Sequence, residues 1–141
     1  MRLFLILSAS LIVMSSSVQA MTLSCDIKSR TDHGSYDGGR GIPSDVIESW
    51  SPKKQVHILN LKMGTAVYKG AEFKTKLDVL NDKTIQWKYI ESRSDKNKTT
   101  FSPIIFKYHY IRKNHRMVSS VDFGPGYLNI VSFKGRCTEH K

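Results

Sequence analysis

The sequence predicts an all-β domain, an antiparallel meander of about eight strands that forms a small barrel or sandwich. From Gln55 onward, short runs of β-favouring residues alternate with turn signals. No repeat of fixed length and no coiled-coil heptad recurs. Two cysteines lie near opposite ends of the chain, where one bond between them would join the first strand to the last.

Residues 1–20 have the pattern of a cleaved signal peptide. Arg2 precedes the apolar run LFLILSASLIVM, and Val18-x-Ala20 fits cleavage after small residues. The apolar run is shorter than the roughly 20 residues needed to cross a bilayer. We therefore expect residues 21–141 to form a single exported β-domain, in the periplasm or outside the cell.

The stretch 31–52 differs in composition from the rest of the chain. It contains four glycines and no long alternation of polar and apolar residues. Ser44 or Asp45 can cap a short helical turn that must end by Pro52. We expect one long N-terminal loop that carries this turn, with Trp50 anchored in the core.

The expected strands follow in order as β-favouring runs. They are TLSCDIKS (22–29), QVHILNLK (55–62), TAVYKG (65–70), EFKTKLDVL (72–80), TIQWKYIES (84–92), TFSPIIFKYHYIR (100–112), HRMVSSVDF (115–123) and YLNIVSFKGRC (127–137). A slip of one residue between paired strands moves every side chain to the other face, so apolar pairing indicates the register of each hairpin.

The first hairpin is expected to turn through a three-residue loop at 81–83. The resulting pairs are Val79 with Ile85, Leu77 with Trp87 and Thr75 with Tyr89. The outward side chains are then Lys74, Lys76, Asp78, Gln86 and Lys88. This register makes one face of the hairpin consistently apolar.

The second hairpin is expected to turn at Lys113-Asn114, because Asn tolerates the left-handed conformation. The resulting pairs are Tyr110 with Met117, Tyr108 with Ser119 and Phe106 with Val121. The outward side chains are Lys107, His109 and Arg116.

The third hairpin, around 123–126, admits two registers. A three-residue loop buries Tyr127, Val131 and Phe133, whereas a two-residue loop buries Leu128 and Ile130. We prefer the first, because it aligns Phe133 with Met117.

Cys25 and Cys137 are the only cysteines of the chain. In an oxidising compartment a lone pair at opposite ends of a domain most simply forms one disulfide. In the chain-entropy model, closing so long a loop stabilises the fold by roughly 4 to 5 kcal/mol. Neither cysteine has a CxxC partner or a neighbouring His that would activate it.

The net charge of +10 is concentrated in the middle of the chain. Between residues 53 and 116 there are 15 Lys/Arg against 5 Asp/Glu, and the rest of 21–141 has 6 against 7. Such a region attracts polyanions or an anionic membrane surface. The alternative is an ordinary solvated face.

Enzyme, metal and cofactor signatures are missing from the sequence. It contains no GxSxG elbow, no SxxK and no Cys/His pair supported by the register. The five histidines have no metal-ligand spacing: His33, His57, His109, His115 and His140. The GGRG stretch at 38–41 lacks the spacing of a phosphate-binding loop. We predict no catalytic residues, no metal and no cofactor.

A basic outward set is the most specific feature that the sequence predicts. Its members come from two hairpins whose registers follow from apolar pairing alone: Lys74, Lys76, Lys88, Lys107, His109 and Arg116. The aromatic side chains between them fall on the core side, which disfavours base stacking and hence nucleic acid. The leading hypothesis is a noncatalytic exported protein that contacts an anionic envelope component through this face.

Two further hypotheses concern other parts of the barrel. An interior lined by aromatic residues could carry a small amphipathic ligand, the candidates being Tyr68, Trp87, Tyr89, Tyr108 and Tyr110. This architecture resembles that of lipocalins, but their Gly-x-Trp signature is absent, since Glu48-Ser49 precedes Trp50. The third hypothesis is a structural or assembly factor that adds a strand to a partner.

Overall fold

The structure is a computed structural model that describes residues 20–32, 52–69, 74–94, 98, 100–123 and 130–141. Several predictions lie outside these residues: the signal peptide up to residue 19, the helical turn after Ser44, the anchoring of Trp50 and the burial of Tyr127.

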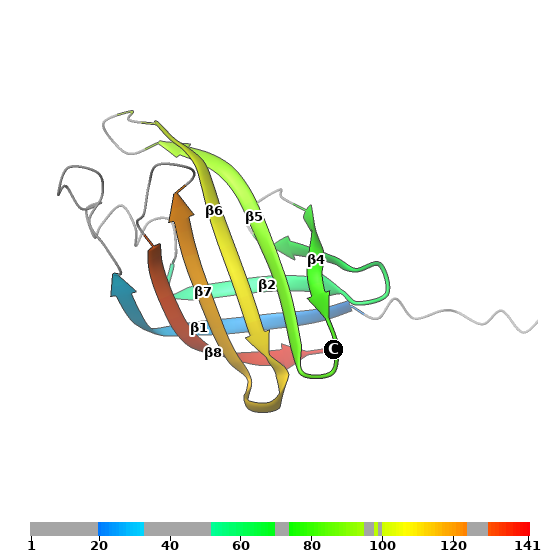
Figure 1. Ribbon diagram of the computed structural model, residues 1–141. Helices are drawn as coiled ribbons and strands as arrows, with labels where there is room; N and C mark the ends of the chain where they lie inside the picture. The colour runs from blue at the N-terminus through cyan, green and yellow to red at the C-terminus, as the bar shows by residue number, and fades with distance from the viewer. Residues whose placement is uncertain (1–19, 33–51, 70–73, 95–97, 99, 124–129) are drawn as a thin grey trace, which may run out of the picture.

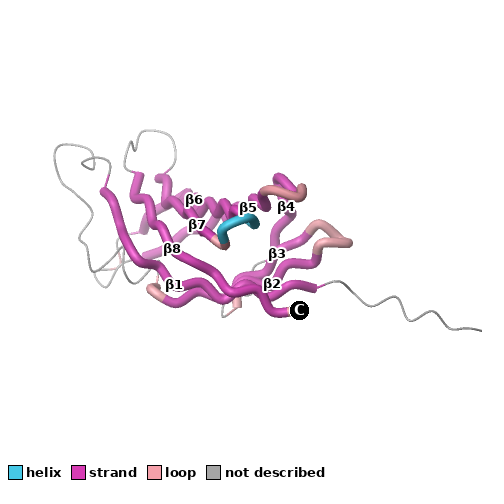
Figure 2. Tube along the Cα trace, turned by 90° about the horizontal axis from the view of Figure 1, so that it is seen from below, coloured by secondary structure: helices cyan, strands magenta, loops and turns pink. Residues whose placement is uncertain are grey.

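Eight antiparallel strands form a closed barrel in which each strand pairs with its sequence neighbours and β8 pairs with β1 (Figure 1). The strands are β1 (Ala20–Asp32), β2 (Lys54–Asn60), β3 (Thr65–Tyr68), β4 (Lys74–Leu80), β5 (Thr84–Ser94), β6 (Thr100–Ile111), β7 (Arg116–Phe123) and β8 (Ile130–His140). Seen at a right angle, the strands surround a common interior (Figure 2). The predicted all-β meander is confirmed, and it closes as a barrel.

Alternation of side chains between the inner and outer faces of the strands builds the core. In β2, for example, Gln55, His57 and Leu59 are buried, whereas Ile58 between them is exposed. The buried apolar residues form one cluster inside the barrel: Met21, Leu23, Cys25, Leu59, Ala66, Ile85, Trp87, Tyr89, Ile104, Phe106, Tyr108, Tyr110, Met117, Val121, Val131, Phe133 and Cys137.

The β4–β5 hairpin has the predicted register at Leu77 but not nearer to its turn. Leu77 pairs with Trp87 as predicted, but Val79 pairs with Gln86 rather than Ile85. A bulge between Leu77 and Val79 places one extra residue in β4. The predicted pairing of Val79 with Ile85 is therefore wrong, although the outward positions of β4 and β5 are as expected.

The cause of this difference is the side chain of Asn81 at the turn. Its Oδ1 accepts hydrogen bonds from the backbone N–H groups of Lys83 and Thr84, both at 2.9 Å. The N–H of Asn81 also donates to the carbonyl of Thr84 at 3.1 Å. These bonds tighten the turn by one residue, and the bulge restores the register further along the sheet.

The β6–β7 hairpin has the predicted register in full. Its pairs are Tyr110 with Met117, Tyr108 with Ser119 and Phe106 with Val121. A single 3-10 turn over Arg112–Asn114 connects the strands. The left-handed residue is His115 (φ 53°) and not Asn114, because the turn places the reversal of the chain one residue later.

The β7–β8 register differs from the preferred prediction by two residues. Phe133 pairs with Ser119, and Met117 pairs instead with Gly135. A shift of two residues leaves every side chain on its predicted face, so Val131 and Phe133 are buried as expected. The turn itself, residues 124–129, lies outside the described residues.

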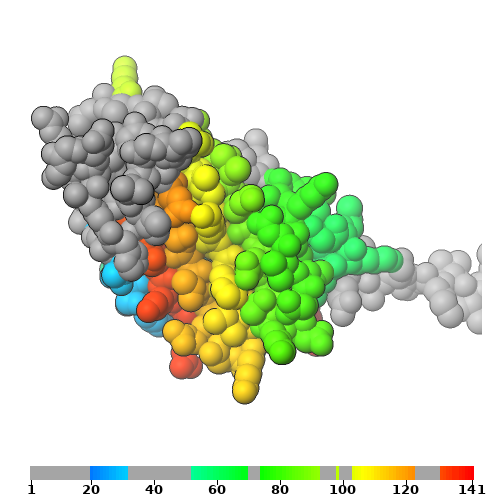
Figure 3. Space-filling model, in the orientation of Figure 1, coloured from blue at the N-terminus to red at the C-terminus, as the bar shows by residue number. Residues whose placement is uncertain are grey.

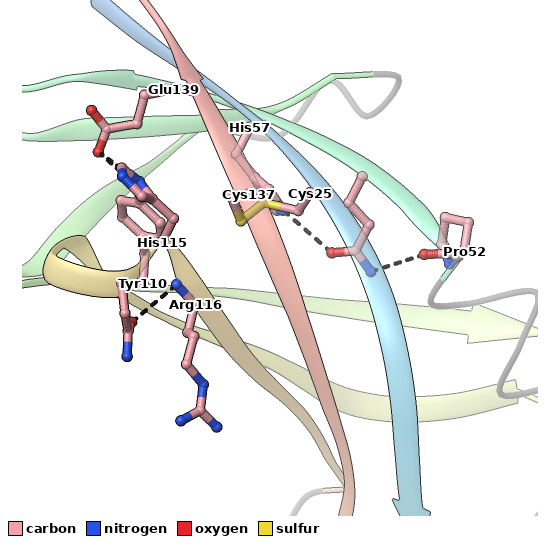
Figure 4. Close-up of a disulfide and its surroundings, with 10 residues drawn as sticks. Cys25, Pro52, His57, Tyr110, His115, Arg116, Cys137 and Glu139 are labelled. Carbon is pink, nitrogen blue, oxygen red and sulfur yellow. Dashed lines mark hydrogen bonds and ion pairs between the residues drawn. A yellow bond between two sulfur atoms is a disulfide. The ribbon is translucent and has the colours of Figure 1, made fainter.

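The predicted disulfide joins Cys25 and Cys137, which are 112 residues apart in the sequence. The two cysteines are directly opposed in the register of β1 and β8 (Figure 4). Both are buried. The covalent bond thus lies at the contact between the first and last strands that closes the barrel.

Gly135 permits a close approach between the same two strands. A Cβ atom built at this position would lie within 2.3 Å of the carbonyl oxygen of Asp26 and 3.1 Å of the Cα atom of Ile27. These are backbone atoms, so no side-chain rotation can relieve the clash. The β1–β8 register shifts just beyond this point, between Ile27 and Ser29.

We predict that Gly135→Ala lowers the free energy of unfolding by roughly 1 to 3 kcal/mol, the usual cost of forcing extra atoms into a packed site. Thr138→Ala, at an exposed position of the same strand, should change it by less than about 0.5 kcal/mol. Urea unfolding of both variants measures the difference. Equal stabilities would show that β1 moves away from Gly135 without cost.

Candidate functional site

The six residues of the predicted basic set all lie on the outside of the barrel, on β4 to β7. Figure 3 shows this side of the molecule, with β4 in green, β6 in yellow, β7 in orange and β8 in red. The lysines and Arg116 are exposed, whereas His109 is half-buried. We call the outward-facing side chains of β4 to β8 the basic outer face.

Two lysines of the basic outer face are paired with acids. Lys88 Nζ lies 3.9 Å from Asp78 Oδ1 on β4. Lys107 forms an ion pair with Asp122 on β7, and this carboxylate has only 17% of its side chain exposed. Both acids were outside the predicted set, although Asp78 was expected to point outward.

The same two lysines are directly opposed across β5 and β6. Like charges at directly opposed positions of a sheet destabilise it, because they repel each other. The acids at the two edges therefore flank a pair of cations. The order across the strands is acid, lysine, lysine, acid.

A second cationic group occupies β7 and β8. Arg116 is directly opposed to Arg136, and Lys134 lies two positions along β8 on the same face. All three side chains are exposed. Among the described residues, none of the three has an acid within ion-pair distance of 4.0 Å, and we call them the unpaired cations.

Sequence reasoning missed Lys134 and Arg136. The signal was present in the alternation of β8, because Phe133, Gly135 and Cys137 all point inward. The third hairpin admitted two registers, however, and they differ in which residues of β8 lie beside β7. The position of Lys134 and Arg136 next to Arg116 therefore did not follow from the sequence.

The outer face is hollowed over β5 to β7. A cavity of about 460 Å³ is lined by Asp78, Gln86, Trp87, Lys88, Lys107, Tyr108, His109, Val118, Ser119 and Ser120. A smaller hollow of about 230 Å³ is lined by Lys74, Thr75, Lys88, Tyr89 and Ile90. Lys88 borders both hollows, so they adjoin.

His109 brings an unsatisfied polar atom to the larger hollow. Its Nε2 is buried and has no hydrogen-bond partner. The residue is opposed to Gln86 on one side and Val118 on the other. A ring nitrogen without a partner can donate to or accept from a bound molecule, according to its tautomer.

The predicted cavity residues pack against one another inside the barrel. The rings of Tyr68, Trp87 and Tyr108 lie 5.0, 5.2 and 4.5 Å from the ring of His57. Trp87 and Tyr108 are also stacked, with centroids 5.4 Å apart. The imidazole thus occupies the space between these aromatic rings, a role that the sequence did not reveal.

His57 is fully buried, and its imidazole also contacts the side chain of Gln55. Its Nε2 lies 3.4 Å from Gln55 Oε1, and the amide of Gln55 donates to the carbonyl of Pro52 at 3.2 Å (Figure 4). Burial lowers the pKa of His57 from 6.5 to about 3. The imidazole is therefore neutral at any ordinary pH.

Tyr110, the fifth predicted cavity residue, belongs to a hydrogen-bonded group at one end of the barrel. Its hydroxyl donates to Glu139 Oε1 at 2.7 Å and lies 2.8 Å from His115 Nδ1 (Figure 4). Burial and the neighbouring carboxylate raise the pKa of Tyr110. These contacts connect the β6–β7 turn to β8.

Within the described part of the chain, no group of three or more His, Cys, Asp or Glu side chains could hold a metal ion. The same residues contain no helix that is long and apolar enough to cross a bilayer.

The fold and the outer face define the class of this protein: a disulfide-closed antiparallel β-barrel with a basic, hollowed outer surface. No protein-family model, no curated protein and no solved structure matches the chain.

We predict that His57 makes the fold sensitive to acid. The unfolded chain takes up a proton at His57 below about pH 6.5, whereas the folded chain does not until about pH 3. The stability that depends on the neutral imidazole is complete above pH 6.5 and is lost as the pH falls, by about 1.4 kcal/mol per pH unit.

His57→Gln should flatten this part of the stability profile, measured by urea unfolding between pH 7 and 4. Carboxylates titrate in both proteins, so the difference between the two profiles isolates His57. The control is His140→Gln at an exposed position, which should leave the profile unchanged. Parallel profiles for parent and His57→Gln would contradict the prediction.

Proposed function

We propose that this chain is a noncatalytic, exported binding protein whose basic outer face contacts an anionic component of the cell envelope. The observation that carries the proposal is the direct opposition of Arg116 and Arg136, next to Lys134, with no acid in ion-pair distance among the described residues. On its other side Arg136 is opposed to Asp26 of β1, whose ion pair is with Lys28 and not with Arg136. The repulsion between the two arginines is therefore left for a bound anion to relieve.

The wider face supports this proposal. Its described cations extend over five strands: Lys74, Lys76, Lys88, Lys107, Arg116, Lys134 and Arg136. Its described acids, Asp78 and Asp122, are fewer and are already paired with two of those lysines. A surface with such an excess of one sign raises the local concentration of anions and speeds their association.

Export is inferred from two features. The N-terminal sequence has the pattern of a cleaved signal peptide, and the fold is closed by a disulfide that persists in oxidising compartments.

The other two hypotheses gain less from the structure. Three of the five aromatic rings proposed to line a ligand cavity, those of Tyr68, Trp87 and Tyr108, contact His57, and Tyr89 contacts Tyr108. Closure of the barrel pairs β1 with β8, which uses the edges that an open meander would offer for strand addition. Neither hypothesis has an observation that favours it over the basic outer face.

The test compares two variants with the same change in net charge. Arg116→Gln, Lys134→Gln and Arg136→Gln together remove the unpaired cations. The control removes three exposed lysines from the β2 side of the barrel: Lys53, Lys54 and Lys62, each changed to Gln.

Binding to lipopolysaccharide and to immobilised heparin should fall at least tenfold for the first variant and less than threefold for the control. Parent binding should also weaken steeply between about 50 and 200 mM salt, as charge-driven association does. The proposal is wrong if both variants lose affinity equally, since net charge alone would then explain binding.

A further inference from the structure

The larger hollow of the basic outer face combines charges of both signs. Lys88 and Lys107 are opposed between β5 and β6, while Asp78 and Asp122 form ion pairs with them from β4 and β7. A site for a simple anion, such as inorganic phosphate, gains nothing from two carboxylates, which repel it. A molecule that carries an acidic group together with hydroxyl groups uses both kinds of side chain.

Neutral polar side chains complete this donor and acceptor set. Gln86 and Ser120 line the hollow, and the buried Nε2 of His109 has no hydrogen-bond partner. An amide, a hydroxyl and an imidazole each bind hydroxyl groups by donating or accepting a hydrogen bond. Val118 adds an apolar contact of the kind that packs against the face of a sugar ring.

The shape of the hollow restricts the ligand further. Its volume of about 460 Å³ lies within the usual range of small-molecule sites. The planar surface of a bilayer cannot enter a concavity on a sheet, whereas a sugar unit or a chain of such units can. The adjoining hollow at Lys74 and Thr75 shares Lys88, which extends the available surface toward β4.

We infer that the hollow on β5 to β7 binds an acidic sugar unit of an oligosaccharide, with Lys88 and Lys107 on its carboxylate and Asp78 accepting hydrogen bonds from its hydroxyl groups. This inference rests on the proposed function and names the chemistry of the anionic partner.

The test uses a trisaccharide of uronic acid residues, with a neutral trisaccharide and vesicles of anionic phospholipid for comparison. In the ¹⁵N-labelled protein, the uronate trisaccharide should shift the amide resonances of residues 86–88, 107–109 and 118–120. The neutral trisaccharide and the vesicles should not produce this pattern.

Asp78→Ala separates sugar recognition from charge attraction. The variant raises the net charge by one, so binding driven by charge alone becomes tighter. Loss of a hydroxyl acceptor instead weakens uronate binding, by at least fivefold. Asp82→Ala, at an exposed turn position outside the hollow, makes the same change in charge and should bind as tightly as the parent or slightly more so.

Two results overturn the inference while leaving the proposed function intact. The first is tighter uronate binding by Asp78→Ala, and the second is binding of vesicles or lipopolysaccharide without any binding of the uronate trisaccharide. Failure of the parent to bind any of these anions would overturn the proposed function together with the inference.

Discussion

Pairing of the first strand with the last is the constraint on which the rest of this structure depends. β1 and β8 run side by side over most of their length, and the disulfide between Cys25 and Cys137 joins them at opposed positions. The approach is so close that position 135 has room for glycine alone. Closure turns the strand meander into a barrel with an inside and an outside, and the outer surface of β8 then continues that of β7.

Aromatic side chains and His57 pack together inside the barrel, whereas charged side chains gather on its outer surface. A barrel of eight strands is just wide enough for side chains to fill or for one small ligand to occupy. Here His57 occupies the space between Tyr68, Trp87 and Tyr108, and its burial keeps it neutral. Two hollows lined by described residues lie on the outer face, where Lys88 borders both of them.

The alternation of polar and apolar residues predicted which side chains point inward and which point outward. The register between neighbouring strands was harder to predict, because it depends on the length and hydrogen bonds of each turn. The β6–β7 register followed from apolar pairing because a short turn left a single consistent choice. Near Asn81 the pairing was wrong, since two hydrogen bonds to one side chain outweighed the pairing of Val79 with Ile85. The predicted partner of Phe133 was wrong by two residues, which left every side chain of β8 on its predicted face. The error did, however, misplace the cations of β8 relative to those of β7. The larger hollow could not be predicted from the sequence. Alternation tells which side chains point outward, but not how the sheet curves and so not where those side chains leave space.

The ion pairs on the outer face fix the positions of the lysine side chains more than they stabilise the fold. Exposed pairs such as Lys88 with Asp78 add little to the free energy of folding, typically less than about 1 kcal/mol. Holding each ammonium group against an acid at the edge nevertheless limits the positions that the two opposed lysines adopt. A ligand then loses less side-chain entropy when it binds between them, because part of that entropy is already lost in the free protein. Arg116 and Arg136 form no ion pair of 4.0 Å or less with a described acid, although Asp26 is opposed to Arg136 on β1. Their charges are therefore free to attract an anion over a distance, whereas the paired lysines suit its final placement.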